Sequence, residues 1–136
     1  MRGFTLIELV IIIVVLGIMA AVAIPVVGSF LQNSKITATK DELRTLAKAI
    51  AGTEAGNDRG FEGDVGYAPS ALRDLAKKPD SILVWNAFTH VGWNGPYIDS
   101  TRNDYLSDSW GTAYAYSAGG RTIQSSGSGT AITVTF

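Results

Sequence analysis

The residue with the clearest chemical consequence in this sequence is Glu8, a carboxylate inside an apolar run. Residues 4–24 are apolar or small except for Thr5 and Glu8. A charged side chain near the centre of a membrane-spanning helix costs about 2.5–3.5 kcal/mol, and less toward its end. Arg2 is the only other charge nearby, so Glu8 predicts a partner from outside its own segment. If the chain were cut after Gly3, the new α-amine of the following residue could neutralise Glu8 of a neighbouring subunit.

The other candidate groups for catalysis form no recognisable pattern. The chain has no cysteine, which excludes disulfides, thiolate zinc sites and cysteine nucleophiles. His90 is the single histidine, so a two-histidine metal site is excluded and a packed or surface-loop role is expected. Glu62 and Asp64 fall in the glycine-rich segment 52–65, which we expect to be a mobile loop. No serine lies in G-x-S-x-G, and no phosphate-binding glycine motif follows a strand. An enzyme is not expected.

Charge is distributed unevenly along the chain. The 136 residues carry a formal net charge of −1 and a mean hydropathy of +0.19, yet residues 1–32 contain only two charged side chains. The length fits one domain together with a membrane segment. The near-neutral balance provides no basic surface for nucleic acid, so no nucleic-acid partner is expected.

The apolar run has the length of a membrane span. As a helix, 21 residues extend about 31 Å, close to the hydrocarbon thickness of a bilayer. A cleaved secretory signal fits poorly because the apolar stretch is too long and no cleavage site is evident. An ordinary signal anchor remains open, although it does not explain Glu8. Gly17 and Pro25 weaken a helix, so residues 18–24 are expected to bend or unwind when subunits pack; a tolerated kink is the alternative.

The remainder predicts an amphipathic helix followed by a small sheet. Apolar residues at helical spacing mark one face of residues 30–51, with Gly52 and Gly56 as stops: Ile36, Leu43, Leu46, Ala47 and Ile50. A short helix is expected over 70–78, with Ser70 as N-cap. Three antiparallel strands are expected over 113–117, 121–125 and 131–136. The sequence therefore predicts an α+β fold in which a long N-terminal helix packs on a three-stranded antiparallel sheet.

Two sets of motifs carry a family resemblance. The residues G-F-T-L-I-E at positions 3–8, followed by about 20 apolar residues, resemble the leader junction of type IV pilins and type II secretion pseudopilins. Further along, an ordered set of motifs resembles the major, G-type pseudopilin over nearly the whole chain: Tyr67-x-Pro69, W-N-G-P-Y at 93–97, D-S-W-G at 108–111, and S-x-G at 125–127. Taken singly, W-N-G-P-Y and D-S-W-G are expected to be turns with aromatic packing.

The resemblance implies a processed and assembled protein. A prepilin peptidase would remove residues 1–3 by cutting between Gly3 and Phe4, and Phe4 would be N-methylated. Phe4 and Glu8 would then set the register between subunits. Residues 4–27 would form the transmembrane and assembly helix, 28–56 the amphipathic helix, and 57–136 the soluble domain.

The resemblance also implies partners and a location. Other copies, other pilins or pseudopilins, the peptidase, an inner-membrane assembly platform and membrane lipid would contact the chain. It would span the inner membrane once with its C-terminal domain in the periplasm, and then enter a periplasmic pseudopilus or a surface filament. The leading hypothesis is a pseudopilus subunit in type II secretion. A type IV pilus subunit for adhesion, motility or DNA uptake is the second, and a membrane-anchored periplasmic binding module is the third.

One departure from the family concerns calcium. The G-type pseudopilins commonly bind a structural calcium through acidic and hydroxyl ligands in their C-terminal loops. Here no Asp or Glu follows Asp108, whereas calcium takes six to eight oxygens, usually with more than one carboxylate. Asp99, Asp104 and Asp108 could contribute from the preceding loop, but solvated turn acids are the expectation. No cofactor is therefore expected.

Overall fold

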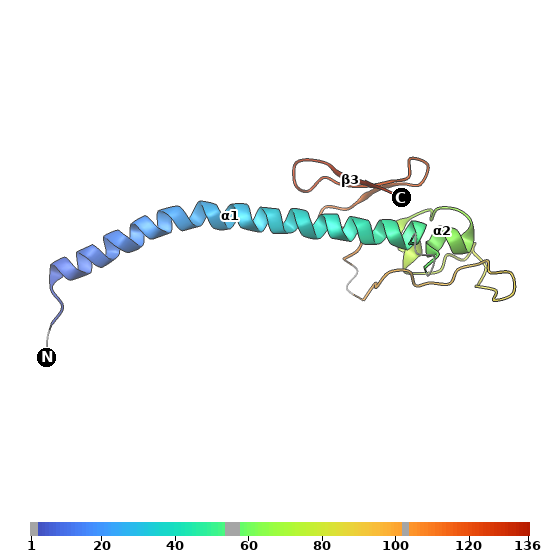
Figure 1. Ribbon diagram of the computed structural model, residues 1–136, viewed down its shortest axis with the longest axis horizontal. Helices are drawn as coiled ribbons and strands as arrows, with labels where there is room; N and C mark the ends of the chain where they lie inside the picture. The colour runs from blue at the N-terminus through green and yellow to red at the C-terminus, as the bar shows by residue number, and fades with distance from the viewer. Residues whose placement is uncertain (1–2, 54–57, 102–103) are drawn as a thin grey trace. The chain divides into compact units, whose positions relative to one another are not determined.

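The computed structural model describes residues 3–53, 58–101 and 104–136, apart from the side chain of Pro25. Met1 and Arg2 of the predicted leader, and Gly56 as a predicted helix stop, lie outside this range. The chain divides into two compact units, Met1–Lys35 and Ile36–Phe136, which are considered separately. In chain order the elements are α1, Leu6–Ala51; α2, Gly60–Val65; the 3₁₀-helix η1, Leu72–Leu75; and three strands (Figure 1).

The first unit is formed by the N-terminal part of α1. Its most apolar 18-residue window has a mean hydropathy of 3.2 and is 0% buried, so α1 is long and apolar enough to cross a membrane. Because the apolar side chains occupy every face, this stretch has no polar side to turn toward water. The helix was predicted to begin at Phe4 and begins instead at Leu6.

The second unit builds its core on the amphipathic part of α1. Leu43, Leu46 and Ile50 are fully buried, which confirms the predicted face, while Ile36 at its edge is half-buried. The helix ends at Ala51 because Gly52 adopts a φ of +81°. A Cβ at Gly52 would lie 2.5 Å from the carbonyl oxygen of Asp58, so this predicted stop requires glycine.

The segment after α1 contains a helix where a mobile loop was expected. α2 covers Gly60–Val65, and its side chain Phe61 is fully buried against the ring of Tyr97, with the two ring centroids 5.6 Å apart. The glycines of this segment have low helix propensity and favour a loop, so the sequence did not predict the helix. Burial of one aromatic ring outweighs that preference.

The short helix predicted over 70–78 is smaller than expected. Only Leu72–Leu75 is helical, and it is a 3₁₀ turn. Ser70 is not its N-cap: Ala71 occupies that position, and its backbone N–H donates to the carboxylate of Asp74 at 3.0 Å. The buried side chains Leu72 and Leu75 hold the turn against the core.

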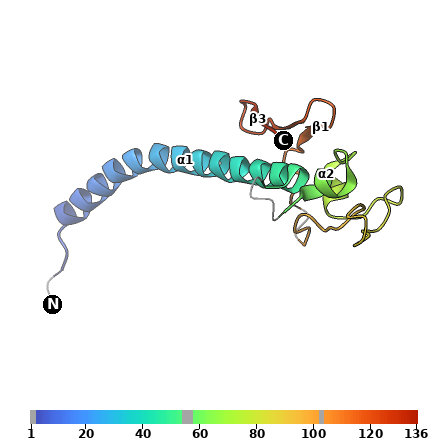
Figure 2. The same cartoon turned by 45° about the vertical axis from the view of Figure 1, so that its right-hand side comes forward.

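The three predicted strands are present as one antiparallel sheet in the order β1-β2-β3. β1 is Ala115–Ser117, β2 is Thr122–Ser125 and β3 is Ile132–Thr135, each slightly shorter than expected. Tyr116 pairs with Ile123, and Ile123 pairs with Val134. The sheet lies beside residues 36–51 of α1 in both views (Figures 1 and 2), and Ile123 shares a buried cluster with Leu43. The predicted α+β fold is confirmed.

Candidate functional site

The first turn of α1 provides Glu8 with a partner that the sequence analysis missed. The Oε2 atom of Glu8 accepts hydrogen bonds from the backbone N–H and the hydroxyl of Thr5, both at 2.8 Å. The backbone N–H of Glu8 donates in return to the Thr5 hydroxyl oxygen at 3.3 Å. This reciprocal arrangement is a capping box, and its signature T-x-x-E was visible at positions 5–8. Thr5 therefore fixes the helix start at Leu6.

An apolar surface surrounds this capped end. Phe4 is 84% exposed, and large apolar side chains remain exposed along the helix as far as Leu31. A contiguous apolar surface of this size on a protein marks contact with a membrane or with another protein. The segment can therefore partition into a bilayer or pack against other apolar helices.

The predicted helix-loosening residues lie within α1. The helix continues through Gly17 and Pro25 in the single chain. A Cβ added at Gly17 would meet no atom within 4 Å, so nothing in the described part of the chain requires glycine there. The loosening was predicted for packed subunits and stays a prediction, and the side chain of Pro25 lies outside the described residues.

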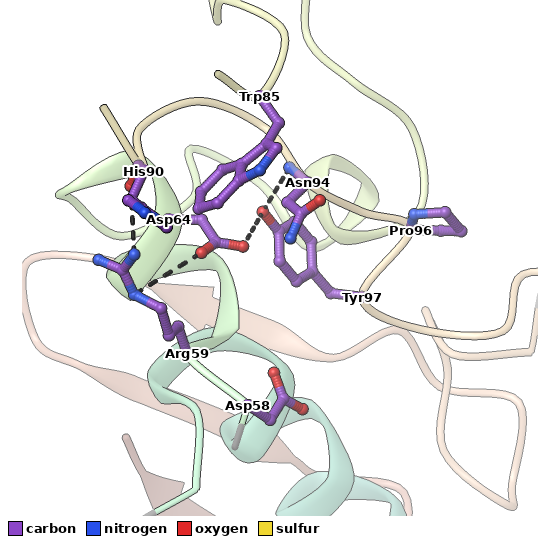
Figure 3. A pocket seen from close by; sticks show the side chains of 8 residues that line it. All are labelled: Asp58, Arg59, Asp64, Trp85, His90, Asn94, Pro96 and Tyr97. Carbon is purple, nitrogen blue, oxygen red and sulfur yellow. Dashed lines mark hydrogen bonds and ion pairs between the residues drawn. The ribbon is translucent and has the colours of Figure 1, made fainter. Parts of the chain in front are cut away.

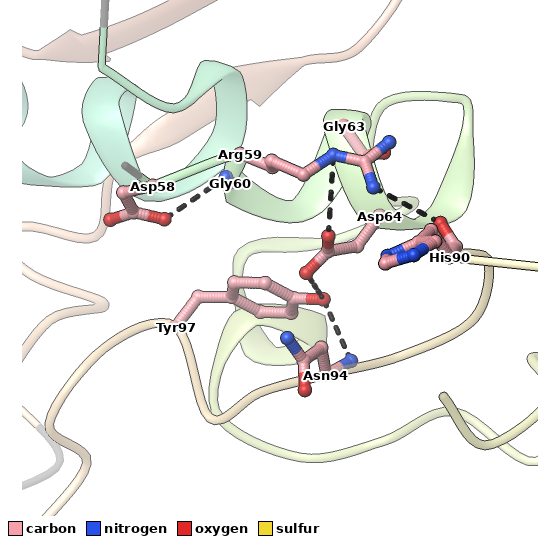
Figure 4. A network of polar contacts seen from close by, with 8 residues as sticks. All are labelled: Asp58, Arg59, Gly60, Gly63, Asp64, His90, Asn94 and Tyr97. Carbon is pink, nitrogen blue, oxygen red and sulfur yellow. Dashed lines mark hydrogen bonds and ion pairs between the residues drawn. The ribbon is translucent and has the colours of Figure 1, made fainter. Parts of the chain in front are cut away.

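A polar network joins α2 to the long loop that follows η1 (Figure 4). Its centre is the carboxylate of Asp64, whose side chain is 5% exposed. The hydroxyl of Tyr97 donates to Oδ2 of Asp64 at 3.0 Å, and Nε of Arg59 lies 3.9 Å from Oδ1. Arg59 also donates to the carbonyl oxygens of Gly63 at 2.6 Å and His90 at 3.2 Å. Asp64 thus belongs to an ordered, largely buried network and not to the mobile loop that was expected.

A pocket of about 310 Å³ opens beside this network (Figure 3). Burial raises the pKa of Tyr97 to about 12, and the bond to Asp64 adds to the shift while the Asn94 N–H opposes it. The phenol therefore stays protonated at neutral pH and acts as a donor. His90 is exposed, as expected for a loop histidine, and its ring meets Trp85 edge-on with centroids 5.8 Å apart. The arrangement fixes the loop and does not activate a nucleophile.

The W-N-G-P-Y motif has the predicted aromatic packing, but residues 94–97 form neither a turn nor a bend. The rings of Trp93 and Tyr97 meet edge to face with centroids 5.8 Å apart. The indole N–H of Trp93 donates to the carbonyl oxygen of Asp74 at 3.0 Å, which links this motif to η1. Its role in the described structure is to pack the loop onto the core.

The D-S-W-G motif forms the predicted turn, but its acid is not solvated. Asp108 is 5% exposed, which contradicts the expectation of a solvated turn acid. Burial alone would raise the pKa of Asp108, but four hydrogen bonds to the carboxylate outweigh burial and lower the pKa. The donors are the Ser125 hydroxyl and the backbone N–H groups of Thr112, Trp110 and Gly127. The acid therefore stays ionised and organises the turn.

The other two acids considered for calcium behave differently from Asp108. Asp99 is exposed and accepts hydrogen bonds from the backbone and hydroxyl of Thr101. Asp104 is also exposed. Within residues 3–53, 58–101 and 104–136, no three His, Cys, Asp or Glu side chains gather in a way that could hold a metal ion.

Comparison with known proteins identifies the N-terminal segment. Residues 1–24 match the family model described as the prokaryotic N-terminal methylation motif. The chain is 32% identical to the type II secretion system core protein G of Pseudomonas aeruginosa over 124 residues, which cover 87% of this chain and 74% of that protein. No solved structure matches the chain.

Pilus proteins are also among the relatives. The chain is 32% identical to the type IV major fimbrial protein FimA of Dichelobacter nodosus over 72% of this chain and 61% of that protein. It is 41% identical to the type IV major pilin protein PilA of Myxococcus xanthus over 50% of this chain. That second match spans only 32% of PilA.

Proposed function

Because this chain belongs to the family of type IV pilins and type II secretion pseudopilins, we propose that it is a structural subunit of a helical pseudopilus acting in type II protein secretion. Members of the family form filaments with other pilins or pseudopilins, and this chain is a filament subunit and not an enzyme. The observation that carries the proposal is the extent of the likeness to core protein G, which covers 87% of the chain, soluble domain included.

Before assembly, the subunit is held in the inner membrane by α1, with its C-terminal domain in the periplasm. A prepilin peptidase removes residues 1–3, and the new amine of Phe4 is methylated. These steps require access to the chain around Gly3, and Phe4, beside that bond, is exposed and precedes the first helical residue, Leu6. The peptidase and the assembly platform are proposed partners.

Assembly exchanges lipid for protein around α1. Apolar side chains that are exposed in the single chain become buried against neighbouring helices, which compensates for the loss of lipid contact. The amine of Phe4 in one subunit neutralises Glu8 of the next, because an unpaired carboxylate in an apolar layer is costly. Thr5 keeps one oxygen of Glu8 bonded, so the carboxylate enters the contact with a fixed orientation.

Three variants of the full-length chain separate the charge of Glu8 from its role as a cap. Glu8→Ala removes both; Glu8→Gln keeps an oxygen acceptor for Thr5 but removes the charge; Thr5→Ala removes the hydroxyl and keeps the charge. Filament yield is measured by cross-linking in cells, and membrane insertion by fractionation. We expect both Glu8 variants to insert normally and to lose filaments about 100-fold, from the cost of an unpaired charge. Thr5→Ala should lose far less.

A loss in Thr5→Ala as large as that in Glu8→Ala, together with a near-normal yield from Glu8→Gln, would show that Glu8 acts only as a helix cap. Normal filament yield from Glu8→Ala would overturn the assembly mechanism. Mass spectrometry of the mature chain tests processing directly: a methylated Phe4 at the N-terminus is expected, and an intact Met1 in assembled filaments would contradict the proposal.

The alternative is a type IV pilus subunit, which the match to FimA over 72% of the chain favours. A strain lacking the gene distinguishes the two functions. Loss of folded exoproteins from the medium with normal surface motility supports the pseudopilus. Loss of motility or of surface pili with normal secretion would assign the chain to a pilus instead.

A further inference from the structure

The strongest buried polar centre in the C-terminal part of the domain is the carboxylate of Asp108. Its Oδ1 atom accepts hydrogen bonds from the backbone N–H groups of Trp110 at 3.0 Å and Thr112 at 2.9 Å. Its Oδ2 atom accepts one from the Ser125 hydroxyl at 2.6 Å and one from the backbone N–H of Gly127 at 2.9 Å. The two oxygens of a carboxylate offer about four acceptor positions, and all of them are occupied here.

This donor set does not fit a cation. The four groups that are hydrogen-bonded to the Asp108 carboxylate are all N–H or O–H donors, so the positive ends of their dipoles converge on it. A calcium ion requires the opposite arrangement, with six to eight oxygen acceptors directed inward. To coordinate calcium, Asp108 would have to give up bonds to Ser125 or to the backbone.

The surrounding loops do not supply a replacement set of ligands. The segment that follows Gly127 contains no carboxylate, and its Ser128 hydroxyl donates to the carbonyl oxygen of Thr130 at 2.6 Å. Asp99 already accepts two bonds from Thr101. The calcium implied by the resemblance to G-type pseudopilins therefore does not fit the residues present in this part of the structure.

We propose that Asp108 closes the C-terminal loops of this domain without calcium, through a clasp formed by the Asp108 carboxylate with Ser125 and Gly127. The clasp joins the D-S-W-G turn to the end of β2 and to the turn that follows it. Its neighbour extends the connection to α1: the hydroxyls of Thr39 and Ser109 are hydrogen-bonded at 3.0 Å, and Thr39 is fully buried. Loops that a bound ion would otherwise fix are thus fixed by protein groups alone.

The clasp also requires glycine at position 127. A Cβ at this position would lie 2.5 Å from Oδ2 and 2.7 Å from Oδ1 of Asp108. A carboxylate held by four hydrogen bonds cannot move aside without breaking some of them. The close approach of the Gly127 backbone thus depends on the absence of a side chain.

The test measures thermal unfolding of the full-length protein in detergent micelles, with millimolar calcium or with a chelator. Wild type should melt at the same temperature in both. Asp108→Asn should lower the melting temperature by about 5–15 °C in both, because its amide N–H₂ would face the N–H of Gly127. Ser125→Ala should cause a smaller loss, and Gly127→Ala should cause a loss without changing any charge. Asp104→Asn, an exposed acid of the same loop, is the matched control and should not lower the melting temperature.

Direct binding provides the second measurement. Terbium, which occupies calcium sites, emits strongly when a nearby tryptophan transfers energy to it, and Trp110 lies two residues from Asp108. We expect no sensitised emission that calcium competes away. A rise of several degrees in the melting temperature of wild type with calcium, abolished in Asp108→Asn or Ser125→Ala, would overturn the proposal. So would calcium-sensitive terbium emission. Failure of these predictions would leave the filament assignment intact, because that assignment is tested by assembly and secretion.

Discussion

The two units of this chain differ in whether their apolar side chains are exposed or buried. In the first unit, the described side chains of α1 from Leu6 to Leu31, which leave out Pro25, remain exposed although most are apolar. In the second, the core-facing apolar residues of α1 share a buried cluster with residues of the sheet, α2 and η1, and Leu43, Leu46 and Ile50 have no exposed surface. The first unit therefore requires lipid or another subunit, whereas the second has its own core. The two parts of α1 therefore differ: the domain buries apolar side chains of one part and leaves those of the other part exposed.

The difference also appears in the polar groups. The second unit holds its charges in defined contacts, such as Asp64 with Tyr97 and Asp108 with Ser125. In the first unit, the one acid of the apolar run is bonded only locally to Thr5 among the contacts described for it. Substitutions should accordingly affect stability in the second unit and assembly in the first.

The largest expected effect on stability is at Phe61. Replacing this fully buried ring by alanine should lower the free energy of unfolding by about 3–5 kcal/mol, since it removes apolar contacts and leaves a cavity. Thermal unfolding of the full-length chain measures the change. Phe4→Ala, at an exposed ring of the first unit, is the matched control and should leave the melting temperature unchanged. Equal decreases in melting temperature for Phe61→Ala and Phe4→Ala would contradict the difference between the two units.

The next effect is the response of the second unit to acid. Because the pKa of Asp108 is lowered in the folded state, its contribution is present above the unfolded pKa near 4 and is lost as pH falls further. Glu42 acts in the opposite direction: burial raises its pKa, its bond from the Tyr114 hydroxyl opposes the shift, and nearby Asp104 and Asp108 add to it. Protonation of Glu42 therefore favours the fold.

Stability should consequently hold or rise slightly as pH falls from 7 toward 5, and then decline steeply below about 4. Unfolding by denaturant at each pH measures this curve. In Asp108→Asn the decline in stability below pH 4 should be shallower. In Glu42→Gln the slight rise in stability between pH 7 and pH 5 should be absent. An unchanged acid limb in Asp108→Asn would show that other carboxylates control acid unfolding.

A smaller effect is expected at Arg121. Its guanidinium forms two bonds with the Glu62 carboxylate, at 2.7 and 2.9 Å, and so joins α2 to the turn before β2. Because the Arg121 side chain is half exposed, Arg121→Met should cost much less stability than Phe61→Ala, and less still at high salt. Arg44→Met, which breaks the exposed pair with Asp41, is the control and should cost less than about 0.5 kcal/mol. A cost that is independent of salt would contradict the electrostatic explanation.

The smallest effect on the melting of the second unit belongs to Gly17. Alanine would meet open space and should favour the helix by about 1 kcal/mol without altering the melting of the second unit. If close packing or loosening requires glycine, filament yield should nevertheless fall. A Gly17→Ala variant that assembles normally would exclude both roles.

The sequence predicted those features that depend on periodic burial or on short motifs. The face of α1 that carries Leu43 and Ile50, the three strands and the α+β fold are confirmed, because alternation and helical spacing follow directly from burial. α2 could not be predicted, since its stability comes from Phe61 packing on Tyr97, a contact between residues 36 positions apart. The burial of Asp108 was missed for the same reason: its partner Ser125 ends β2, and its partner Gly127 lies in the turn that follows.

The capping box at the start of α1 was missed for a different reason. Thr5 and Glu8 are close in sequence, and their spacing alone was sufficient to predict the contact. The charge of Glu8 in an apolar layer indicated a distant partner and not a local one. The structure shows that a local bond to Thr5 exists in the single chain. Whether Phe4 of a neighbour joins it is what the assembly variants test.

The bonds between α1 and the last third of the chain have a consequence for timing. Thr39 bonds to Ser109, and Glu42 accepts from Tyr114, across separations of 70 and 72 residues. Synthesis delivers the N-terminal residues first, so the apolar part of α1 is available to the membrane while residues 36–51 still lack the groups that bury them. The second unit can close only after residues 105–125 have been synthesised. In the proposed topology, translocation would therefore precede folding of this unit.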